Sequence, residues 1–556
     1  MKEKYRKIQF EVQCVDLSNE GKGVVHHEGV TGFVDNLLPG EKALVETTYR
    51  KKDVFYAKVI EFISKSKDRV KPICPVFKSC GGCKLMHLDY NAQLEYKKNK
   101  VKECLKRIGG IDVPVNDTVG MEEPYFYRNK IQMPIKMHKG KIVSGFYKEK
   151  SHDIVPIDVC YIENKDADHI LMSVKALMKK YRVSPYDEDR RTGVIRHVLI
   201  RNSKLTKENM VILITNVDAF PGRNDFVKEL RRMEPSISTV VQNINTRDTN
   251  VILGEKERIL SGKGFIYDEL CGIKFKISPK SFFQVNPIQT EILYSLAIDS
   301  LNLTGKELVL DAYCGIGTIG LIASKKAKEV IGVEIVKEAV KDANNNARDN
   351  NITNTKFYCG DAGDFIVDQF NQGIVFDVVI MDPPRKGSDE KFLGILRKTK
   401  PKKIAYVSCD PATLARDLKY LVKDYKIETV TPVDMFPNTS HVETVVLLSH
   451  KDSNKHINVK VDFDTQEGKQ FLDEIIENVS SRKPVERASY PEIKEYILNK
   501  YNVKVSTLNI AQIKAKHGII ERECYNKPKN ENPRQPKCTK EKEDLIVDAL
   551  KHFEMI

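Results

Sequence analysis

The chain has 556 residues, and its 91 Lys and Arg residues outnumber its 77 Asp and Glu residues, giving a formal charge of +14 at pH 7. Because single hydrophobic cores rarely exceed about 250–300 residues, we expect several domains. The sequence shows no signal-type apolar segment and no run long enough to span a membrane, so we expect a cytoplasmic protein with no membrane partner. The excess of positive charge favours a polyanionic partner such as RNA.

Residues 1–63 show the alternation of apolar and polar positions that is typical of β-strands. Short runs such as Thr31–Val34 and Ala43–Thr47 are separated by glycines that suit turns, which predicts a small β-barrel. Basic residues near its end would suit the phosphate contacts of a nucleic-acid-binding barrel, although a solvated basic surface explains them equally well. These residues are Lys51, Lys52, Lys65, Lys67 and Arg69.

Four cysteines have a spacing that suggests a metal centre. Cys74, Cys80 and Cys83 lie close together, Cys160 follows at a distance, and the Gly81–Gly82 pair allows a tight bend between two thiols. The spacing permits zinc or an iron–sulfur cluster, and unpaired structural thiols remain an alternative. Other cysteines lack such spacing and are interpreted as small core residues. They are Cys14, Cys104, Cys271, Cys314 and Cys359.

Strand-like runs continue between residues 64 and 280, at 130–135, 194–201 and 210–215. Polar helices and turns join them, which predicts an α+β middle domain. Several basic residues here are candidate RNA contacts, although arginines on a strand more often form only its solvated face. They are Arg128, Arg196, His197 and Arg201.

From about residue 281 the pattern changes to apolar runs that alternate with helical segments, as at 307–311, 330–334 and 376–382. This alternation predicts a doubly wound, Rossmann-like α/β sheet. In such sheets the ligand binds beyond the carboxyl ends of the strands. The polar and thiol side chains expected at those ends are Asp311, Glu334, Asp361, Asp382 and Cys409.

The first of these strands leads into a glycine turn, Gly315-Ile316-Gly317, which lets a ligand approach the backbone. Glu334 ends the second strand, where a carboxylate can hold two ribose hydroxyls. The third glycine of the dinucleotide fingerprint is absent, so the pattern favours S-adenosylmethionine over a pyrophosphate cofactor.

Cys409 follows a buried run that ends at Val407 and precedes a helical segment, which places its thiol well for a nucleophile. Asp382-Pro383-Pro384-Arg385 precedes it and His441-Val442-Glu443-Thr444 follows, each at the junction of an apolar run and a polar turn. Together these motifs predict an active site.

In this order, the segment 281–286 with Gln284, the loop 311–318, and the motifs at Asp382, Cys409 and Glu443 resemble the RNA (uracil-5-)-methyltransferase family. The resemblance spans about residues 1–450. It extends to the N-terminal barrel, which is similar to a TRAM domain. The four cysteines resemble the [4Fe–4S] ligands of the branch that modifies 23S ribosomal RNA, whereas the tRNA branch typically lacks both features.

The resemblance implies a mechanism and a set of site residues. Cys409 would add to C6 of uracil, C5 would take the methyl group of S-adenosylmethionine, and Glu443 would remove the C5 proton. The target base must leave its stack to reach the thiol, and 23S rRNA is the expected partner of a monomeric enzyme. The cofactor-binding site would be lined by Gln284, Tyr313, Thr318, Glu334, Asp361 and Asp382.

Residues 451–556 fall outside the family's pattern. Helical spacing at 471–476, 493–498 and 545–550 predicts a small helical extension, in which Ser506 would cap a recognition helix or a plain packing helix. Cys524 and Cys538 are too isolated to indicate a metal. The whole is a multi-domain α/β protein with expected domains at 1–63, 64–280, 281–450 and 451–556.

Other functions compete with methylation of 23S rRNA. A tRNA uracil-C5 methyltransferase uses the same chemistry, but the barrel and the cysteines argue against it. A non-catalytic RNA-binding or ribosome-assembly protein is disfavoured because Cys409, Glu443 and the cofactor loop are all present. An RNA cytosine methyltransferase would need a second cysteine where this chain has Asp382-Pro383-Pro384.

Overall fold

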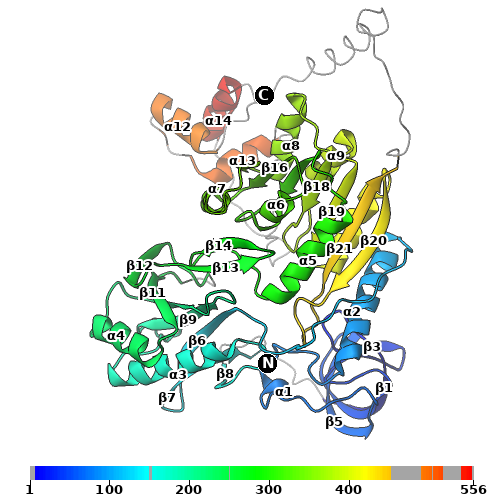
Figure 1. The fold of residues 1–556 in the computed structure, drawn as a ribbon, viewed down its shortest axis with the longest axis vertical. Helices are drawn as coiled ribbons and strands as arrows, with labels where there is room; N and C mark the ends of the chain where they lie inside the picture. Colours follow the sequence, from blue (N-terminus) through cyan, green and yellow to red (C-terminus); the bar gives the residue numbers. More distant parts are fainter. Residues whose placement is uncertain are drawn as a thin grey trace, which may run out of the picture. The chain divides into compact units, whose positions relative to one another are not determined.

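The computed structural model describes residues 7–148, 153–248 and 251–451, and towards the C-terminus residues 490–501, 503, 505–516 and 540–553. The chain divides into two compact units, Met1–Lys455 and His456–Ile556, and each is described by itself. Figure 1 shows the elements of both.

The first unit begins with a closed barrel in the strand order β1-β2-β3-β5-β4, drawn in dark blue in Figure 1. Its strands are β1 (Gln9–Leu17), β2 (Gly23–His27), β3 (Val30–Asp35), β4 (Lys42–Arg50) and β5 (Val54–Ser64). Val12, Val34 and Phe55 fill the interior. A Cβ at Gly32 would lie 2.1 Å from the Phe55 ring, so the barrel closes there only with glycine. The predicted barrel is confirmed.

Helices and a mixed sheet follow the barrel. The seven-stranded sheet has the order β12-β11-β10-β9-β6-β7-β8. Its strands are β6 (Lys130–His138), β7 (Lys141–Tyr147), β8 (Ile154–Pro156), β9 (Ile195–Asn202), β10 (Asn209–Thr215), β11 (Ile237–Ile244) and β12 (Lys256–Ser261). The helices of this part are α1 (Phe77–Cys80), α2 (Tyr90–Cys104), the π-helical turn Leu105–Gly109, α3 (Lys165–Lys180) and α4 (Arg223–Met233).

The structure of the central sheet contradicts three of the four RNA contacts that the sequence suggested for this region. Arg196 is buried and donates to the carbonyls of Asn245 and Arg247. Arg201 is also buried and donates to the carbonyl of Ser281. His197 is 7% exposed. The prediction that these three contact RNA is therefore wrong, because β9 is buried on both faces and its cations bind backbone carbonyls instead.

A short hairpin, β13 (Ile266–Leu270) and β14 (Ile273–Ile277), leads into the third layered region. This region is a seven-stranded sheet in the order β17-β16-β15-β18-β19-β21-β20. Its strands are β15 (Leu308–Ala312), β16 (Glu329–Glu334), β17 (Thr355–Cys359), β18 (Val378–Met381), β19 (Lys403–Ser408), β20 (Tyr425–Val433) and β21 (Glu443–His450). Its helices are α5 (Pro287–Ser300), α6 (Thr318–Ala323), α7 (Lys337–Asp349), α8 (Ala362–Asn371), α9 (Glu390–Thr399) and α10 (Pro411–Leu421).

Strands β15 to β19 are parallel. At one end of this sheet β21 is antiparallel to β19, and β20, antiparallel to β21, again runs in the direction of β19. The chain runs outward from β15 to β17 and then returns to place β18 on the other side of β15. This reversal is the position at which doubly wound sheets bind ligands. The predicted Rossmann-like sheet is confirmed.

The cysteines predicted to be core residues divide between buried and solvent-facing positions. Cys14, Cys104 and Cys314 are buried as predicted, and Cys271 is half-buried. Cys359 is exposed, so the prediction is wrong for that residue; it ends β17, which is the edge strand of the sheet.

The second unit contains α12 (Tyr490–Tyr501), α13 (Thr507–Lys516) and α14 (Lys540–His552). Ile493, Ile510 and Ile546 belong to its apolar core. Ser506 caps α13 by accepting a hydrogen bond from the Asn509 backbone N–H at 3.1 Å. The helices expected at 493–498 and 545–550 are confirmed.

Some expectations for the C-terminal part fall on residues that are not described. The helix expected at 471–476 lies outside the described residues, and so do Cys524 and Cys538. Across the described ranges, every helix is too short or too polar to cross a bilayer.

A buried ion pair joins α2 to the segment that follows β20. The side chains of Lys97 and Asp434 are both 0% exposed and contact each other through Nζ and Oδ1. Lys97 also donates to the carbonyl of Phe436 at 3.1 Å, and the hydroxyl of Tyr90 donates to Asp434 Oδ2 at 3.0 Å. Both charges are therefore compensated inside the protein, which is the condition under which a buried pair can persist.

Replacing Lys97 by Met should strongly destabilise the first unit, because Asp434 would keep a buried charge without its cation. We expect a loss of about 3–5 kcal/mol in the free energy of unfolding, measured by urea denaturation. Lys98→Met is the matched control, since Lys98 pairs with Asp117, whose side chain is 93% exposed. The control should leave the free energy of unfolding nearly unchanged, because solvent screens an exposed pair. Equal effects of the two variants would mean that burial adds nothing to the cost of removing the Lys97 charge.

Candidate active site

The strand register brings Cys409 and Glu443 together. In the antiparallel pair of β19 and β21, Ser408 lies opposite Thr444. Cys409 directly follows Ser408, and Glu443 directly precedes Thr444, so these two residues are neighbours at the same edge. The parallel pairing of β18 with β19 places Asp382, which follows Met381, at the same edge. One edge of the sheet therefore presents a thiol and two carboxyl groups.

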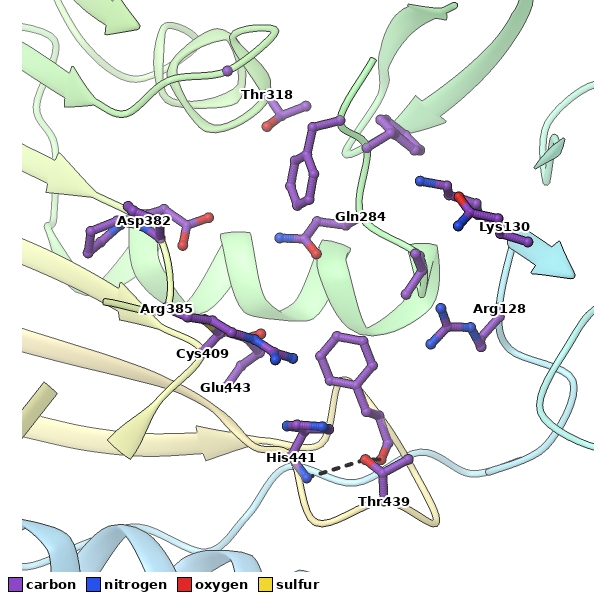
Figure 2. A pocket seen from close by; sticks show the side chains of 18 of the residues that line it. Arg128, Lys130, Gln284, Thr318, Asp382, Arg385, Cys409, Thr439, His441 and Glu443 are labelled. Carbon is purple, nitrogen blue, oxygen red and sulfur yellow. Dashed lines mark hydrogen bonds between the residues drawn. The ribbon is translucent and has the colours of Figure 1, made fainter. Parts of the chain in front are cut away.

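This edge opens into a cavity of about 1010 Å³. The cavity is lined by every residue that the sequence singled out for catalysis, cofactor or metal. They are Gln284, Tyr313, Thr318, Glu334, Asp361, Asp382, Cys409 and Glu443, with Cys74, Cys80, Cys83 and Cys160. Figure 2 shows Cys409, Glu443 and Arg385 grouped on one side, with Gln284 between this group and Arg128. The structure unites these residues in space, and their individual roles stay predictions.

The turn that carries Cys409 is fixed by its neighbours. Asp410 caps α10 by accepting hydrogen bonds from the backbone N–H groups of Ala412 and Thr413 at 2.9 and 3.1 Å. Ser408 Oγ donates to the carbonyl of Asp410 at 3.1 Å. Burial, followed by the nearby Glu443 and Asp382, raises the pKa of the Cys409 thiol to about 12, while Arg385 opposes the rise. The group is therefore a thiol at neutral pH.

The carboxyl groups beside it also hold their protons more tightly than usual. Burial raises the pKa of Glu443 to about 8, and the neighbouring Asp382 adds to the shift. Burial raises the pKa of Asp382 to about 7 and that of Asp311 to about 8. A carboxyl group that titrates near neutrality can both accept and donate a proton, which suits Glu443 for general acid–base chemistry.

Another group of cavity residues has the features of a nucleoside site. Glu334 accepts hydrogen bonds from the backbone N–H groups of Gly315 at 3.2 Å and Val336 at 2.9 Å. Phe282 and Ile335 line the same cavity and are 72% and 70% exposed, so they offer apolar surface to a flat ring. A carboxylate between apolar side chains suits a ribose joined to a base.

Hydrogen bonds and backbone conformation hold the residues of this part of the cavity wall in place. Gly320 donates its N–H to Asp311 Oδ2 at 2.8 Å, and a Cβ there would lie 2.6 Å from the same oxygen. Tyr313 has φ 66°, and its hydroxyl lies 2.8 Å from Ser388 Oγ.

Asp361 caps α8 by accepting hydrogen bonds from the backbone N–H groups of Gly363 and Asp364. Thr318 Oγ1 lies 3.5 Å from the Tyr294 hydroxyl. Asp361 and Thr318 thus have structural partners as well as a place in the cavity wall.

Cations and a neutral imidazole complete the walls. Arg128 and Lys130 line the cavity from the start of β6, and burial, followed by Arg201 and Arg128, lowers the pKa of Lys130 to about 8. Burial also lowers the pKa of His441 to about 4, with Arg385 adding to the effect, so the ring is neutral. The sequence named Arg385 and His441 only as members of motifs and missed Lys130, whose signal was its place two residues after Arg128.

The four cysteines line another wall as free thiols. Burial raises the pKa of Cys83 to about 12, and Cys80 and Cys74 add to the rise, so these three sulfurs lie close enough to interact. Burial likewise raises the pKa of Cys160. Within the described part of the chain, no three His, Cys, Asp or Glu side chains already surround a metal position.

Comparisons with known proteins agree with this geometry. Residues 89–451 match the family model described as tRNA (uracil-5-)-methyltransferase. Proteins named uncharacterized RNA methyltransferases are 45% identical over 447 residues in Clostridium acetobutylicum and 46% identical over 442 residues in Listeria innocua. These matches cover 80% and 79% of this chain and 97% of each relative.

A solved structure is also similar. It is the Pyrococcus abyssi tRNA (uracil-54, C5)-methyltransferase in complex with S-adenosyl-L-homocysteine, which is 30% identical with a TM-score of 0.64. The match covers 79% of this chain and 100% of that chain.

Alkylation of Cys409 by iodoacetamide should report the raised pKa of its thiol. The rate, measured by mass spectrometry of the Cys409 peptide, should rise about tenfold per pH unit from pH 7, because only the thiolate reacts. Below pH 8, Glu443→Gln should react like the parent protein, since Glu443 is protonated there. Above pH 8 the variant should react faster, because the Glu443 charge that raises the pKa of Cys409 is gone.

The exposed Cys359 supplies an internal reference in the same digest. Its rate should be the same in Glu443→Gln as in the parent protein. A Cys409 rate that levels off near pH 8, or a variant that reacts no faster above that pH, would contradict the geometry of the thiol and the carboxyl group.

Proposed function

The chain belongs to the tRNA (uracil-5-)-methyltransferase family, and from that premise we propose that it transfers a methyl group from S-adenosylmethionine to C5 of a uracil in RNA. The observation that carries the proposal is the pair formed by Cys409 and Glu443 at one edge of the sheet, with Glu334 and apolar side chains lining the same cavity. The protein would act in the cytoplasm, on 23S ribosomal RNA.

The chemistry follows from the two side chains. Uracil C5 is a poor nucleophile. Once Cys409 and Glu443 have each lost a proton to water, addition of the Cys409 thiolate to C6 makes the ring an enolate whose C5 can attack. S-adenosylmethionine supplies the electrophilic methyl group. Glu443 then takes the proton from C5, the bond between C6 and sulfur breaks, and Cys409 is released as a thiolate. A base with a pKa of about 8 can hold this proton and return it to water or to the thiol.

Residues of the cavity account for binding as well as for proton transfer. Gln284 and Tyr313 would orient the reactants, and Glu334 would hold the ribose of the cofactor. A cation near Asp382 lowers the pKa of that carboxyl group and of the Cys409 thiol, since opposite charge favours both ionised forms. The positive charge of S-adenosylmethionine would therefore promote formation of the nucleophile in the complex.

Two observations bear on the RNA substrate. The barrel and the four cysteines favour 23S rRNA, through the resemblance to the branch that has both. The P. abyssi protein is named for tRNA, and its whole chain aligns with 79% of this chain. Residues 64–451 alone make up a smaller share of this chain than that. The shared architecture therefore extends beyond the central and methyltransferase regions, and tRNA is the second candidate.

Methyl transfer from labelled S-adenosylmethionine separates these candidates. We expect 5-methyluridine in protein-free 23S rRNA and none in tRNA that lacks this modification, after digestion to nucleosides. Cys409→Ala should lose all activity because it lacks the nucleophile. Glu443→Gln should accumulate a covalent protein–RNA adduct, seen as a shifted band in a denaturing gel, because the C5 proton is not removed.

Cys359→Ser, at an exposed cysteine outside the cavity lining, is the matched control and should keep full activity. Labelled tRNA would replace the 23S rRNA assignment by the second candidate. Turnover by Cys409→Ala would contradict the assignment of the nucleophile, and failure of both RNAs as substrates would count against the proposed activity.

We also propose that Cys74, Cys80, Cys83 and Cys160 hold a [4Fe–4S] cluster. Their four thiols line one wall of a single cavity. Besides burial, the neighbouring Cys74 thiol raises the pKa of both Cys80 and Cys83, so a cation between these sulfurs would be favoured. Four cysteine thiolates are the donor set that such clusters use. Binding requires the side chains to turn toward one centre, with the backbone of Gly81 and Gly82 providing the bend.

Protein purified without oxygen should contain about four iron atoms per chain and absorb visible light as a brown solution. Cys83→Ser should lose most of the iron, because it removes one of the four ligands. Cys359→Ser is the control and should keep it. Stoichiometric zinc in place of iron, or iron retained in Cys83→Ser, would contradict the assignment.

A further inference from the structure

Three aromatic side chains form a row across neighbouring strands of the barrel. Phe33 on β3 lies opposite Tyr56 on β5, and Tyr56 lies opposite Tyr49 on β4. The ring centroids of Phe33 and Tyr56 are 5.6 Å apart, and those of Tyr49 and Tyr56 are 6.2 Å apart. The strand register thus builds one continuous aromatic surface from residues that are distant in sequence.

The row faces outward from the barrel. Tyr49 and Tyr56 are 46% and 38% exposed, and Phe33 is half-buried. The residues on either side of Tyr56, Phe55 and Ala57, belong to the core instead. The barrel therefore closes without using the two tyrosine rings. Large exposed aromatic side chains that gather in one place often mark a binding surface.

Positive charge adjoins one end of the row. Strand β4 ends at Arg50, and the turn between β4 and β5 carries Lys51, Lys52 and Asp53. The Lys51 ammonium lies 6.0 Å from the centre of the Tyr49 ring. Farther along β5, Lys58 is paired with Glu46 at 3.1 Å, so positive charge is concentrated at the turn. The charges suit a ligand that combines flat rings with phosphates.

We propose that the row of Phe33, Tyr49 and Tyr56 stacks the bases of unpaired RNA nucleotides, while Lys51 and Lys52 contact the phosphates between them. Aromatic side chains beside cations are the means by which proteins bind single-stranded nucleic acid without reading its sequence. The family match begins at residue 89, so it gives the barrel no role. The inference rests on the proposed RNA methyltransferase function and adds a second contact with the same RNA.

Binding of the full-length protein to a fluorescent, unstructured oligouridylate tests the proposal without any methyl transfer. Tyr49→Leu and Tyr56→Leu should each raise Kd about fivefold or more, since each removes one stacking ring. Tyr49→Phe and Tyr56→Phe should bind like the parent protein, because the ring is kept. Tyr267→Leu is the matched control, a half-buried tyrosine outside the barrel whose ring lies 4.2 Å from the Lys274 ammonium, and it should leave Kd unchanged.

The lysines call for a different readout. Lys51→Gln and Lys52→Gln should each reduce the slope of log Kd against log salt concentration by about 0.7, as expected for one lost phosphate contact with a single strand. The tyrosine variants should leave that slope unchanged. Circular dichroism and thermal melting of every variant would show that the barrel stays folded. Where a Leu variant does not fold, the salt dependence of the lysine variants still tests whether this surface binds RNA.

Parent-like affinity of the Tyr49→Leu/Tyr56→Leu double variant would overturn the proposal. So would a change in self-association of that variant with unchanged RNA affinity, which would make the row a protein-binding face. If the parent protein shows no methyl transfer while the variants still differ in RNA affinity as expected, the proposed function is refuted and the base-stacking surface is not.

Discussion

The buried contact between Lys97 and Asp434 is the constraint on which the active site depends. Its partners are 337 residues apart in the sequence, and it fastens the segment after β20 to α2. That segment continues through Phe436 and His441, which line the cavity, and ends at Glu443. Both side chains are 0% exposed, so water cannot replace a lost partner, and the position of Glu443 depends on the position of α2.

Other bonds hold the same loop from the cysteine-bearing side. Asn438, with φ 67°, accepts a hydrogen bond from the Leu85 backbone N–H at 3.0 Å and donates its own N–H to Gln93 at 3.0 Å. The Tyr127 hydroxyl donates to the carbonyl of Pro437 at 3.1 Å. Cys83 lies two residues before Leu85, so a metal bound by the cysteines would stiffen the segment that holds the catalytic loop. The segment after β20 and the segment that carries Cys83 therefore support each other.

The sequence predicted the site residues at the carboxyl ends of the strands better than the residues that other parts of the fold bring to the cavity. Asp311, Asp382 and Cys409 could be predicted to meet because parallel strands end at one edge, and an apolar run followed by a polar residue marks each end. Lys130 and the ion pair of Lys97 could not, since no local pattern records a contact made across the fold. The buried Arg201 shows the same limit, because a cation on a strand has one sequence pattern whether it faces water or a backbone carbonyl. The boundaries of the four expected domains stay predictions.

The electrostatics of the cavity give the chemistry an order. Cys409, Glu443, Asp382 and Asp311 lie where burial raises the pKa of each, and the Asp382 charge raises the pKa of the other three further. At neutral pH the Cys409 thiol therefore keeps its proton, which protects it from alkylation and oxidation. Arg385 opposes the shift only in part. A positively charged cofactor would reverse the balance by favouring the carboxylate of Asp382 and the thiolate together, so that the nucleophile forms when the methyl donor is in place. The acid cluster would then couple cofactor binding to the activation of Cys409.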